Sequence, residues 1–579
     1  MGGGWMQLRE LMEGISYRRL QGEEEQEISG ITEQSGQVQA GMLFCCLKGH
    51  HTDGHELAVQ AVKQGAVALL VEKPLSDVLP GVVILQVQDT RKVWGRVAAA
   101  FYGHPANKMQ LIGVTGTKGK TSVTYMIQKM LQTMGIFCGI IGTTGAFYEG
   151  QSWEVQHTTP SPVRLQQILY EMEKAGCEVV VMEVSSIGLK EGRTQGLLFD
   201  YGIFTNFAPD HIGGMEHGSL EEYFYWKKQL FWQCKCGILN AAEPMARKLY
   251  QEVLEEGEGT GKTERISTVS HRKDEKHVPD NWIWYEVHTE ETWEQSKGTY
   301  NAKNNRYHGF ALRPIHDSFG IGTSFTVVVP EDGNAQVILP LPGTFNVANA
   351  LCAIACAWEC WKNMQKRIRQ DGVWEKHMQQ ESRDGISNWQ GEVYLEQMVH
   401  ALKNVQIRGR MELAGTWNGA TILVDYAHNA SGLEQALMAL RQYAKGRIIC
   451  VFGCGGNRSR LRRSQMGEVS DRLADWTILT EDNSREETVE EIIGDIVQGM
   501  QHLERCQIIP DRAEAIGAAM TMAKPGDVVL IAGKGHEAYQ ERKGVRTHFS
   551  DQETVGTWMQ FHASAEEKSG GGRTEDPVL

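Results

Sequence analysis

The segment with the most specific chemical signature reads G-x-x-G-T-x-G-K-T and covers residues 113–121. An apolar run of strand type precedes it, and apolar residues recur at helical spacing after it, from Val123 to Met134. The backbone N–H groups of such a loop, and the helix N-terminus that follows, attract phosphates. The pattern predicts a nucleotide-binding loop in which Lys120 reaches the phosphates and Thr121 binds Mg²⁺, built from Gly116, Thr117, Lys118, Gly119, Lys120, Thr121 and Ser122.

Larger elements must position this loop. A chain of 579 residues is expected to form three or four domains, at about 100–200 residues each. Apolar strand-like runs alternate with helical segments, a pattern that predicts α/β domains with mostly parallel sheets. We expect a small N-terminal α/β unit over 1–104 and a central α/β domain over 105–408. A second doubly wound domain is expected over 409–562.

Three polar regions interrupt or follow this alternation. We expect loops with short strands at 255–305 and a charged surface insertion at 362–392. We expect a disordered tail at 563–579.

The composition is that of an ordinary soluble protein, with 41% hydrophobic and 22% charged residues. Fifty-eight basic and 72 acidic residues give a net charge of −14, which argues against nucleic acid and anionic membranes as partners. No apolar run approaches the roughly 18–20 residues of a membrane span, and the N-terminus lacks the apolar core of a signal peptide. We therefore expect a cytoplasmic protein without membrane insertion.

The twelve cysteines do not suggest a disulfide scaffold in so long a chain. Cys234 and Cys236 form a C-x-C without a second half, which supports a zinc site only weakly. Cys352, Cys356 and Cys360 recur every four residues, and this spacing favours a buried stripe of small residues on a helix.

Further motifs follow in an order that resembles the Mur ligase family. They include T-T-P-S at 158–161, M-E-V-S-S at 182–186, K-x-x-L-F at 227–231, L-P-G-T-F-N-V-A-N at 341–349, G-R-M-E at 409–412, D-Y-A-H-N at 425–429, F-G-C-G-G-N-R at 452–458, D-N-S-R at 482–485 and G-K-G-H-E at 533–537. Their order is similar to that in the members that add the third residue of the peptidoglycan stem peptide. The resemblance implies a three-domain α/β architecture: a UDP-binding N-terminal domain, a central P-loop ATPase domain and a C-terminal Rossmann-like domain.

The activity that the resemblance implies is ATP-dependent amide ligation. ATP would convert a carboxylate of UDP-N-acetylmuramoyl-L-alanyl-D-glutamate into an acyl phosphate, and the amine of meso-2,6-diaminopimelate would displace phosphate. We expect UDP-N-acetylmuramoyl-dipeptide, ATP and the amino acid as the partners of a monomer, with Mg²⁺ neutralising the phosphates.

The resemblance also implies roles for single residues. Glu183 closes a buried strand, where an unpaired carboxylate would be costly, and it would share the first Mg²⁺ with Thr121. His211 would help to hold a second Mg²⁺, supported by a carbamate on Lys227, although Lys228 is adjacent. Lys120, Glu183, His211 and Lys227 would be the catalytic residues.

Further matching positions would bind the three substrates. Besides the loop, ATP would contact Asn346, Asn349, Arg410, Asp425 and His428. The UDP-substrate would contact Ser35, Thr158, Thr159, Ser185 and Arg193. The amino acid would contact Arg458, Asp482, Asn483, Arg485, Gly533 and Glu537, because guanidinium groups and carboxylates complement the substrate's two carboxylates and two amines.

Several positions depart from the family's pattern, namely Gln34-Ser35-Gly36, Ile187, Asn457 and Ser484. Ser484 replaces a proline, so we expect the loop that carries Arg485 to be less preorganised. L-Lysine or another amino acid therefore stays open as the substrate. Three alternatives remain. Leu47-Lys-Gly49 and Asp53-Gly54 argue against a folate or poly-amino-acid ligase, and the G-K-G-H-E and D-Y-A-H motifs argue against a P-loop NTPase that acts as a switch or motor. A catalytically silent binding module is suggested only by Ile187 and Asn457.

Overall fold

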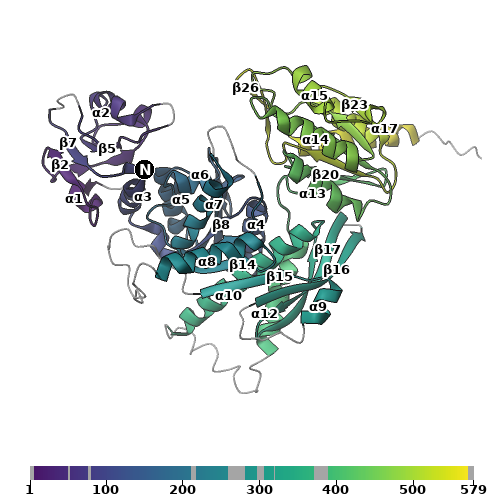
Figure 1. Ribbon diagram of the computed structural model, residues 1–579, viewed down its shortest axis with the longest axis horizontal. Helices are drawn as coiled ribbons and strands as arrows, with labels where there is room; N and C mark the ends of the chain where they lie inside the picture. The colour runs from purple at the N-terminus through teal and green to yellow at the C-terminus, as the bar shows by residue number, and fades with distance from the viewer. Residues whose placement is uncertain are drawn as a thin grey trace, which may run out of the picture. The chain divides into compact units, whose positions relative to one another are not determined.

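The computed structural model describes residues 5–49, 52–75, 80–209, 217–258, 281–296, 306–317, 320–370 and 389–570. The chain divides into two compact units (Figure 1). The first comprises 1–309, 327–335 and 348–401, and the second comprises 310–326, 336–347 and 402–579.

A five-stranded sheet opens the first unit, with the order β2-β7-β6-β5-β4. Its strands from β4 to β7 run parallel, and β2 pairs antiparallel at the edge. The strands are β2 (Arg18–Gln21), β4 (Gly30–Thr32), β5 (Met42–Cys45), β6 (Ala68–Val71) and β7 (Val83–Gln86), with helices α1 (Leu8–Leu11), α2 (Ala58–Lys63) and α3 (Thr90–Phe101). A short pair, β1 (Met6–Gln7) with β3 (Glu27–Ile28), precedes them.

An eleven-stranded sheet follows, with the order β11-β10-β9-β12-β8-β13-β14-β15-β16-β17-β18. The seven strands from β9 to β16 in this order pair in parallel. The strands are β8 (Gln110–Thr115), β9 (Cys138–Gly142), β10 (Gly145–Tyr148), β11 (Gln151–Trp153), β12 (Val179–Glu183), β13 (Phe199–Phe204), β14 (Cys234–Asn240), β15 (Asn281–Val287), β16 (Arg306–Asp317), β17 (Gly320–Val329) and β18 (Gly333–Leu339).

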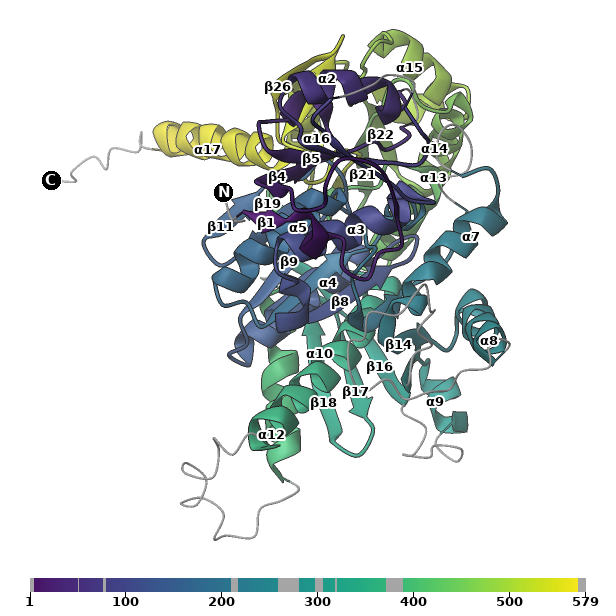
Figure 2. The same cartoon turned by 90° about the vertical axis from the view of Figure 1, so that its left-hand side faces the viewer.

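The chain forms helices between the strands of this sheet and after its last strand (Figure 2). They are α4 (Lys120–Thr133), α5 (Pro162–Lys174), α6 (Ser186–Lys190), α7 (Leu220–Lys228), α8 (Pro244–Glu258), α9 (Glu290–Ser296), α10 (Thr344–Gln370) and α12 (Trp389–His400). Every residue of β8 and β12 is buried, as expected for central strands of a parallel sheet. The predicted apolar face of α4 is confirmed, because Val123, Met126, Ile127, Met130 and Leu131 are fully buried.

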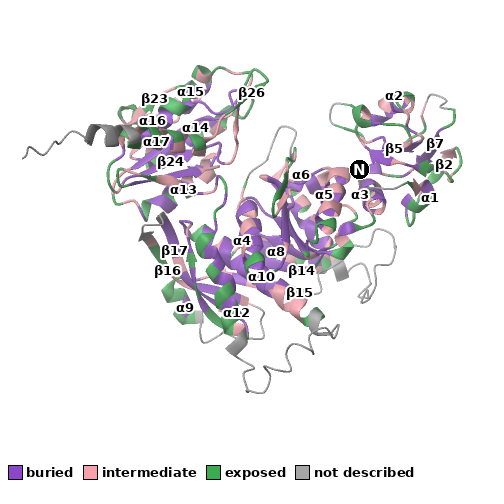
Figure 3. Cartoon of the chain, turned by 180° about the vertical axis from the view of Figure 1, so that it is seen from behind, coloured by how far each residue is buried: buried purple, intermediate pink, exposed green. Residues whose placement is uncertain are grey.

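The second unit contains a six-stranded sheet with the order β19-β20-β24-β21-β22-β23. All pairs except the antiparallel β19–β20 are parallel, and Figure 3 shows β24 as buried. The strands are β19 (Glu412–Trp417), β20 (Ala420–Asp425), β21 (Ile448–Phe452), β22 (Trp476–Leu479), β23 (Cys506–Ile508) and β24 (Val528–Ala532). The helices are α13 (Ala430–Arg441), α14 (Arg460–Leu473), α15 (Val489–Val497), α16 (Arg512–Met522) and α17 (Asp551–Gly570), and a hairpin joins β25 (Tyr539–Arg542) to β26 (Val545–His548).

The structure corrects parts of the three expected polar regions, while residues 259–280, 297–305 and 371–388 lie outside the described residues. Within 255–305, residues 255–258 end α8, 281–287 form strand β15 of the large sheet, and 290–296 form α9. Within 362–392, residues 362–370 are the last turns of α10 and 389–392 the first turn of α12. Residues 563–570 of the expected tail are helical, since α17 continues to Gly570, and 571–579 lie outside the described residues.

The predicted stripe of Cys352, Cys356 and Cys360 is confirmed, because all three thiols are buried along α10. Burial raises their pKa values, which keeps the thiols protonated and unreactive. Among the helices that the structure describes, none combines the length and apolar character needed to cross a membrane.

Candidate active site

The predicted phosphate-binding loop lies between the buried strand β8 and helix α4. Gly116 and Gly119 adopt φ angles of 139° and 84°, which L side chains rarely adopt. A Cβ atom on Gly116 would clash with Thr205 Oγ1, and one on Gly119 would clash with Asn349 Oδ1. Lys120 Nζ donates to the Gly116 carbonyl oxygen at 3.0 Å, so the lysine curls back over the loop. Conformation and close packing therefore both require glycine at these two positions.

The segment after strand β13 holds the other side of the loop. Asn206 accepts a hydrogen bond from the Lys118 amide at 2.9 Å and donates one to the Lys118 carbonyl at 3.1 Å. The Asn206 carbonyl accepts from the Thr117 amide at 3.0 Å, and Thr205 Oγ1 donates to the Lys118 carbonyl at 2.6 Å. These bonds fix the loop backbone before any ligand binds. The T-N pair at 205–206 is another motif of the family resemblance, but the sequence alone assigns no role to Asn206.

Glu183 and Thr121 meet at the carboxyl end of β12, as predicted. Glu183 is 1% exposed, and its Oε1 accepts from Thr121 Oγ1 at 3.0 Å and from the Thr143 amide at 2.9 Å. A Cβ atom on Gly142 would clash with the same carboxylate oxygen. The hydroxyl and carboxylate oxygens therefore converge beside the phosphate-binding loop. Hard oxygen donors of this kind suit Mg²⁺.

The two adjacent lysines of α7 point to different partners. Lys227 is 1% exposed, and its Nζ donates to the Gly116 carbonyl at 2.7 Å and lies 4.5 Å from the centre of the Tyr223 ring. Lys228 Nζ instead binds Glu252 and Glu256 of α8 at 2.7 and 2.6 Å. The geometry thus places Lys227, and not Lys228, against the phosphate-binding loop. His211, the other expected ligand of the second metal, lies outside the described residues.

Three of the residues expected to bind the UDP-substrate gather near Glu183. Thr158 Oγ1 lies 3.1 Å from Thr143 Oγ1. Thr159 is fully buried, donates to the Glu183 carbonyl at 3.0 Å and accepts from the Ser185 amide at 3.0 Å. Ser185 Oγ caps helix α6 by accepting from the Gly188 amide. The hydroxyls of Thr159 and Ser185 therefore shape the backbone around Glu183.

Arg193 reaches the same region, and Ser35 lies in the part of the chain that forms the five-stranded sheet. Arg193 Nη1 donates to the Thr159 carbonyl at 2.8 Å, and its Nε donates to Glu191 at 2.9 Å. Ser35 begins a short turn beside the five-stranded sheet. No hydrogen bond among the described residues joins Ser35 to Thr159 or Arg193.

The residues expected to contact ATP are divided between the two units. Asn349, on α10, faces the phosphate-binding loop at Gly119. Asn346 belongs to the second unit, where its amide donates to the Pro342 carbonyl at 2.8 Å.

The remaining expected ATP residues also lie in the second unit. Asp425 accepts from the Met411 and Ala427 amides at 2.7 and 2.8 Å. The Arg410 guanidinium lies 4.7 Å from the centre of the Tyr426 ring. His428 Nδ1 lies 2.7 Å from the carbonyl oxygen of Tyr426, so both expected residues contact this tyrosine.

Four residues that the resemblance assigned to amino-acid binding form one cluster in the second unit. Asn483 Nδ2 donates to Glu537 Oε2 at 2.8 Å. Asp482 accepts from the Asn483 amide at 2.6 Å, and a Cβ atom on Gly533 would lie 2.6 Å from Asp482 Oδ2. The fully buried Lys534, which sequence reasoning missed, donates to Asn483 Oδ1 at 3.1 Å. Lys534 belongs to the G-K-G-H-E motif, in which the resemblance assigns a role only to Gly533 and Glu537.

Burial controls the charges of this cluster. The pKa of Glu537 is raised, first by burial and then by repulsion from Asp482. Burial lowers the pKa of Lys534, although Asp482 and Glu537, at 3.9 and 3.7 Å, oppose this shift. The cluster therefore sets one buried cation between two carboxylates, and the protonation of Glu537 is sensitive to both neighbours.

Arg485 and Arg458 both adjoin Gly455 at the edge of this cluster. A Cβ atom on Gly455 would lie 3.1 Å from Arg485 Nη1 and 3.8 Å from Arg458 Cγ. Arg485 Nη1 donates to the Gly456 carbonyl at 2.8 Å, and Arg458 is exposed.

The loop that carries Arg485 is better fixed than the loss of proline suggested. The Ser484 hydroxyl donates to the buried Glu481 carboxylate at 2.8 Å. The Arg485 amide donates to the Glu541 carbonyl at 3.0 Å, and the Arg485 carbonyl accepts from the Lys543 amide at 2.7 Å. A serine hydroxyl and the β25–β26 hairpin thus supply the order that the fixed φ of proline would have given.

Asn457, another departure, occupies a left-handed position with φ 54°. Asparagine and aspartate both tolerate that conformation. The substitution therefore leaves the backbone of this turn unstrained.

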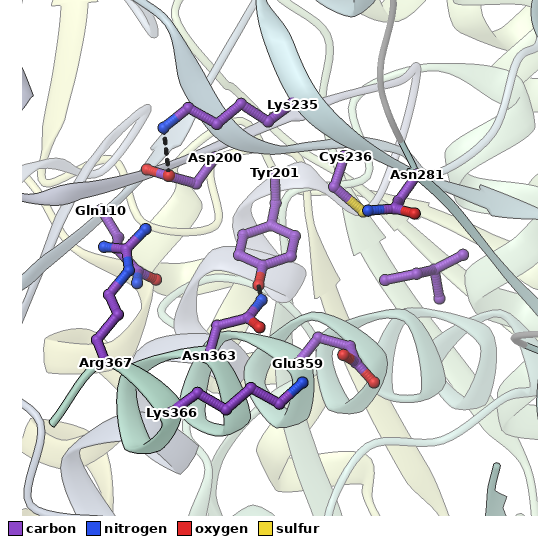
Figure 4. A pocket seen from close by; sticks show the side chains of 11 residues that line it. Gln110, Asp200, Tyr201, Lys235, Cys236, Asn281, Glu359, Asn363, Lys366 and Arg367 are labelled. Atoms are coloured by element: carbon purple, nitrogen blue, oxygen red, sulfur yellow. Dashed lines mark hydrogen bonds and ion pairs between the residues drawn. The ribbon is translucent and has the colours of Figure 1, made fainter. Parts of the chain in front are cut away.

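A cavity of about 310 Å³ lies elsewhere in the first unit (Figure 4). It is formed at the amino ends of β8, β13, β14 and β15, the opposite end of the strands from the phosphate-binding loop. Asn363 donates to the Tyr201 hydroxyl at 2.6 Å, and Lys235 pairs with Asp200 at 2.8 Å along its wall. It contains none of the predicted site residues.

Comparison with known proteins matches three family models along the chain. They are described as "Mur ligase family, catalytic domain", "Mur ligase middle domain" and "Mur ligase, glutamate ligase domain", and they cover residues 27–102, 114–357 and 409–535. Two curated relatives are UDP-N-acetylmuramoyl-L-alanyl-D-glutamate--2,6-diaminopimelate ligases. The one from Clostridium perfringens is 31% identical over 95% of this chain and 99% of its own, and the one from Clostridioides difficile is 32% identical over 95% and 99%. A solved structure of a ligase with the same name superposes with a TM-score of 0.61 at 26% identity, covering 96% of this chain and 99% of its own.

Proposed function

Because the chain belongs to the Mur ligase family, we propose that it joins meso-2,6-diaminopimelate to UDP-N-acetylmuramoyl-L-alanyl-D-glutamate at the expense of ATP. The carboxylate of the dipeptide's glutamate attacks the γ-phosphate of ATP, so that an acyl phosphate forms and ADP leaves. An amine of diaminopimelate then attacks the acyl carbon, an amide forms, and inorganic phosphate departs. The reaction belongs to the cytoplasmic synthesis of peptidoglycan precursors.

The cluster of Asp482, Asn483, Lys534 and Glu537 is the observation that carries the choice of substrate. Diaminopimelate presents two ammonium groups and two carboxylates. Asp482 and Glu537 supply acceptors for an ammonium group. Arg485 beside them supplies a guanidinium that can bind a carboxylate bidentately, through two parallel hydrogen bonds. L-Lysine has no distal carboxylate for that guanidinium.

The phosphate-binding loop supports the ATP half of the proposal. Asn206 fixes the backbone of the loop, and Lys120 lies over it, so a triphosphate would meet a preorganised loop. Thr121 and Glu183 would hold one Mg²⁺, which would neutralise phosphate charge when bound. Their oxygen donors fit that ion.

A carbamate on Lys227 is the second part of this proposal. A neutral amine attacks CO₂, forms an N–C bond and releases a proton, so the side chain gains a carboxylate end. Lys227 is buried against the loop at Gly116, where such an anion would serve a second Mg²⁺ together with His211. The paired neighbour Lys228 would stay an ordinary ammonium.

Phosphate release tests the proposed function. The enzyme should release phosphate from ATP when UDP-N-acetylmuramoyl-dipeptide and diaminopimelate are both present, and mass spectrometry should detect the tripeptide product. Rapid hydrolysis that ignores both substrates would instead identify an NTPase. Product formation with a pteroyl or polyglutamate acceptor, and none with the UDP-dipeptide, would identify a folate-type ligase.

A further inference from the structure

Two buried histidines and a glutamate meet on one face of strands β15 and β16, away from the residues discussed above. Glu286 and His308 are directly paired across the parallel strands, and His288 follows two residues after Glu286. Residues two apart on an extended chain point to the same side. The strand register alone therefore brings the three side chains together.

The distances are short enough for one ion to be shared. One ligand atom from each of Glu286, His288 and His308 lies within 4.8 Å of the other two. His288 Nε2 and His308 Nδ1 are 2.8 Å apart, which is a hydrogen bond between two imidazoles. The histidines are 6% and 5% exposed, and the ring of Trp293, from α9, lies 5.6 and 5.5 Å from their ring centres. The group is thus sheltered from water on the side of α9.

The surroundings of the two imidazoles favour their neutral form, which is the form that binds metal ions. Burial lowers the pKa of both rings, to about 4 for His308, where His288 contributes as well.

From this placement we propose that Glu286, His288 and His308 bind one divalent transition-metal ion, of which Zn²⁺ is the best match. Imidazole and carboxylate ligands suit zinc, which takes nitrogen at about 2.0–2.1 Å and completes a tetrahedron with water when the protein offers three ligands. Two nitrogens of such a tetrahedron are about 3.3 Å apart, so the rings must separate by only a few tenths of an ångström. The proton of the present hydrogen bond then moves to the opposite nitrogen of its ring.

Arg306 is the neighbour that competes with this ion. Its Nη1 lies 3.4 Å from Glu286 Oε2, and its side chain is 43% exposed. A salt bridge of that exposure contributes little to the free energy of folding, so Glu286 can leave Arg306 and bind a divalent cation instead. The site would tie β16 to β15 and to the residue that follows β15. It does not depend on the ligase chemistry.

The test uses the full chain without a histidine tag, stripped with a chelator and titrated with Co²⁺. Wild type should take up one Co²⁺ with visible d–d absorption that Zn²⁺ abolishes and excess Mg²⁺ leaves unchanged, since Mg²⁺ prefers oxygen ligands. His288→Ala and His308→Ala should weaken binding by about 100-fold or more. The exposed His400 provides the control, because His400→Ala should bind as wild type does.

Several results would overturn the site: no d–d band in wild type, a band unchanged in both histidine variants, or a band lost with excess Mg²⁺. If the histidine variants do not fold, Glu286→Gln preserves the side-chain shape and decides the matter. Zn²⁺ should raise the Tm of wild type and raise that of Glu286→Gln much less. Equal shifts in the two proteins would refute the proposal.

Discussion

Replacing Lys534 by methionine is the sharpest test of the amino-acid cluster. The ammonium group is fully buried, donates to Asn483 at 3.1 Å and lies within 4 Å of both Asp482 and Glu537. Methionine fills a similar volume without charge. The change therefore removes the cation and leaves the packing of the pocket largely intact.

The expected loss follows from these contacts. A hydrogen bond to a charged group contributes about 1.5–3 kcal/mol, so kcat/KM for diaminopimelate should fall by roughly one to two decades. KM for ATP should change little, because Lys534 does not belong to the phosphate-binding loop. Lys445→Met, an exposed change in the same unit, is the matched control and should behave as wild type.

The pH profile separates this role from a structural one. Burial and Asp482 already raise the pKa of Glu537, and Lys534 opposes that shift. Since the carboxylate must be ionised to bind an ammonium group, activity should fall on the acid side at a pH above the usual range of glutamate. In Lys534→Met that acid limb should move to still higher pH. A folded variant with unchanged kcat/KM and an unchanged acid limb would refute this reasoning.

Three further changes test separate parts of the molecule. Lys120→Ala should abolish ligation while circular dichroism stays native, because its half-buried Nζ contacts the loop carbonyls of Gly116 and Thr117; ligation near the wild-type rate would contradict the loop assignment. Lys227→Ala should be nearly inactive and partly restored by a short carboxylic acid, whereas Lys228→Ala should stay active; equal activity of the two variants in a phosphate-release assay would count against the carbamate. Arg512→Met should lower the free energy of unfolding by about 3–5 kcal/mol, because it leaves the fully buried Asp551 carboxylate, 2.7 Å from Arg512 Nε, unpaired; an unchanged denaturant midpoint would show that the pair is not needed.

Elements with a strong local pattern were predictable from the sequence. The glycine-rich loop and α4 carry both turn chemistry and a helical apolar period, and they form as predicted. Glu183 could be selected because a lone carboxylate at the end of an apolar strand needs a partner, and Thr121 is that partner.

What escaped prediction depends on contacts distant in sequence. Helix α14 is rich in arginine and has no clear apolar period, yet its Arg463 is buried because Glu487 and Asp495 pair with it. The β25–β26 hairpin has an exposed second strand and no alternation of apolar residues. Strand β15 resembles a loop in the sequence because its neighbours along the chain are polar, whereas its partners β14 and β16 come from separate segments.

The cluster around Glu537 likewise combines residues that could be predicted from the sequence with an arrangement that could not. Its members could be selected residue by residue from motifs, but the central position of Lys534 depends on how β24 and the loop after β22 meet. The spacing of residues in the sequence does not predict that these two segments come into contact.

The most direct measurement of the central claim is kcat/KM for meso-diaminopimelate and for L-lysine, with UDP-N-acetylmuramoyl-L-alanyl-D-glutamate and ATP saturating. Wild type should prefer diaminopimelate, and Arg485→Ala should lose about one to two decades of that preference, because the guanidinium beside Gly455 would no longer bind the distal carboxylate. A wild-type preference for lysine, or an Arg485→Ala variant that keeps the full preference for diaminopimelate, would contradict the account.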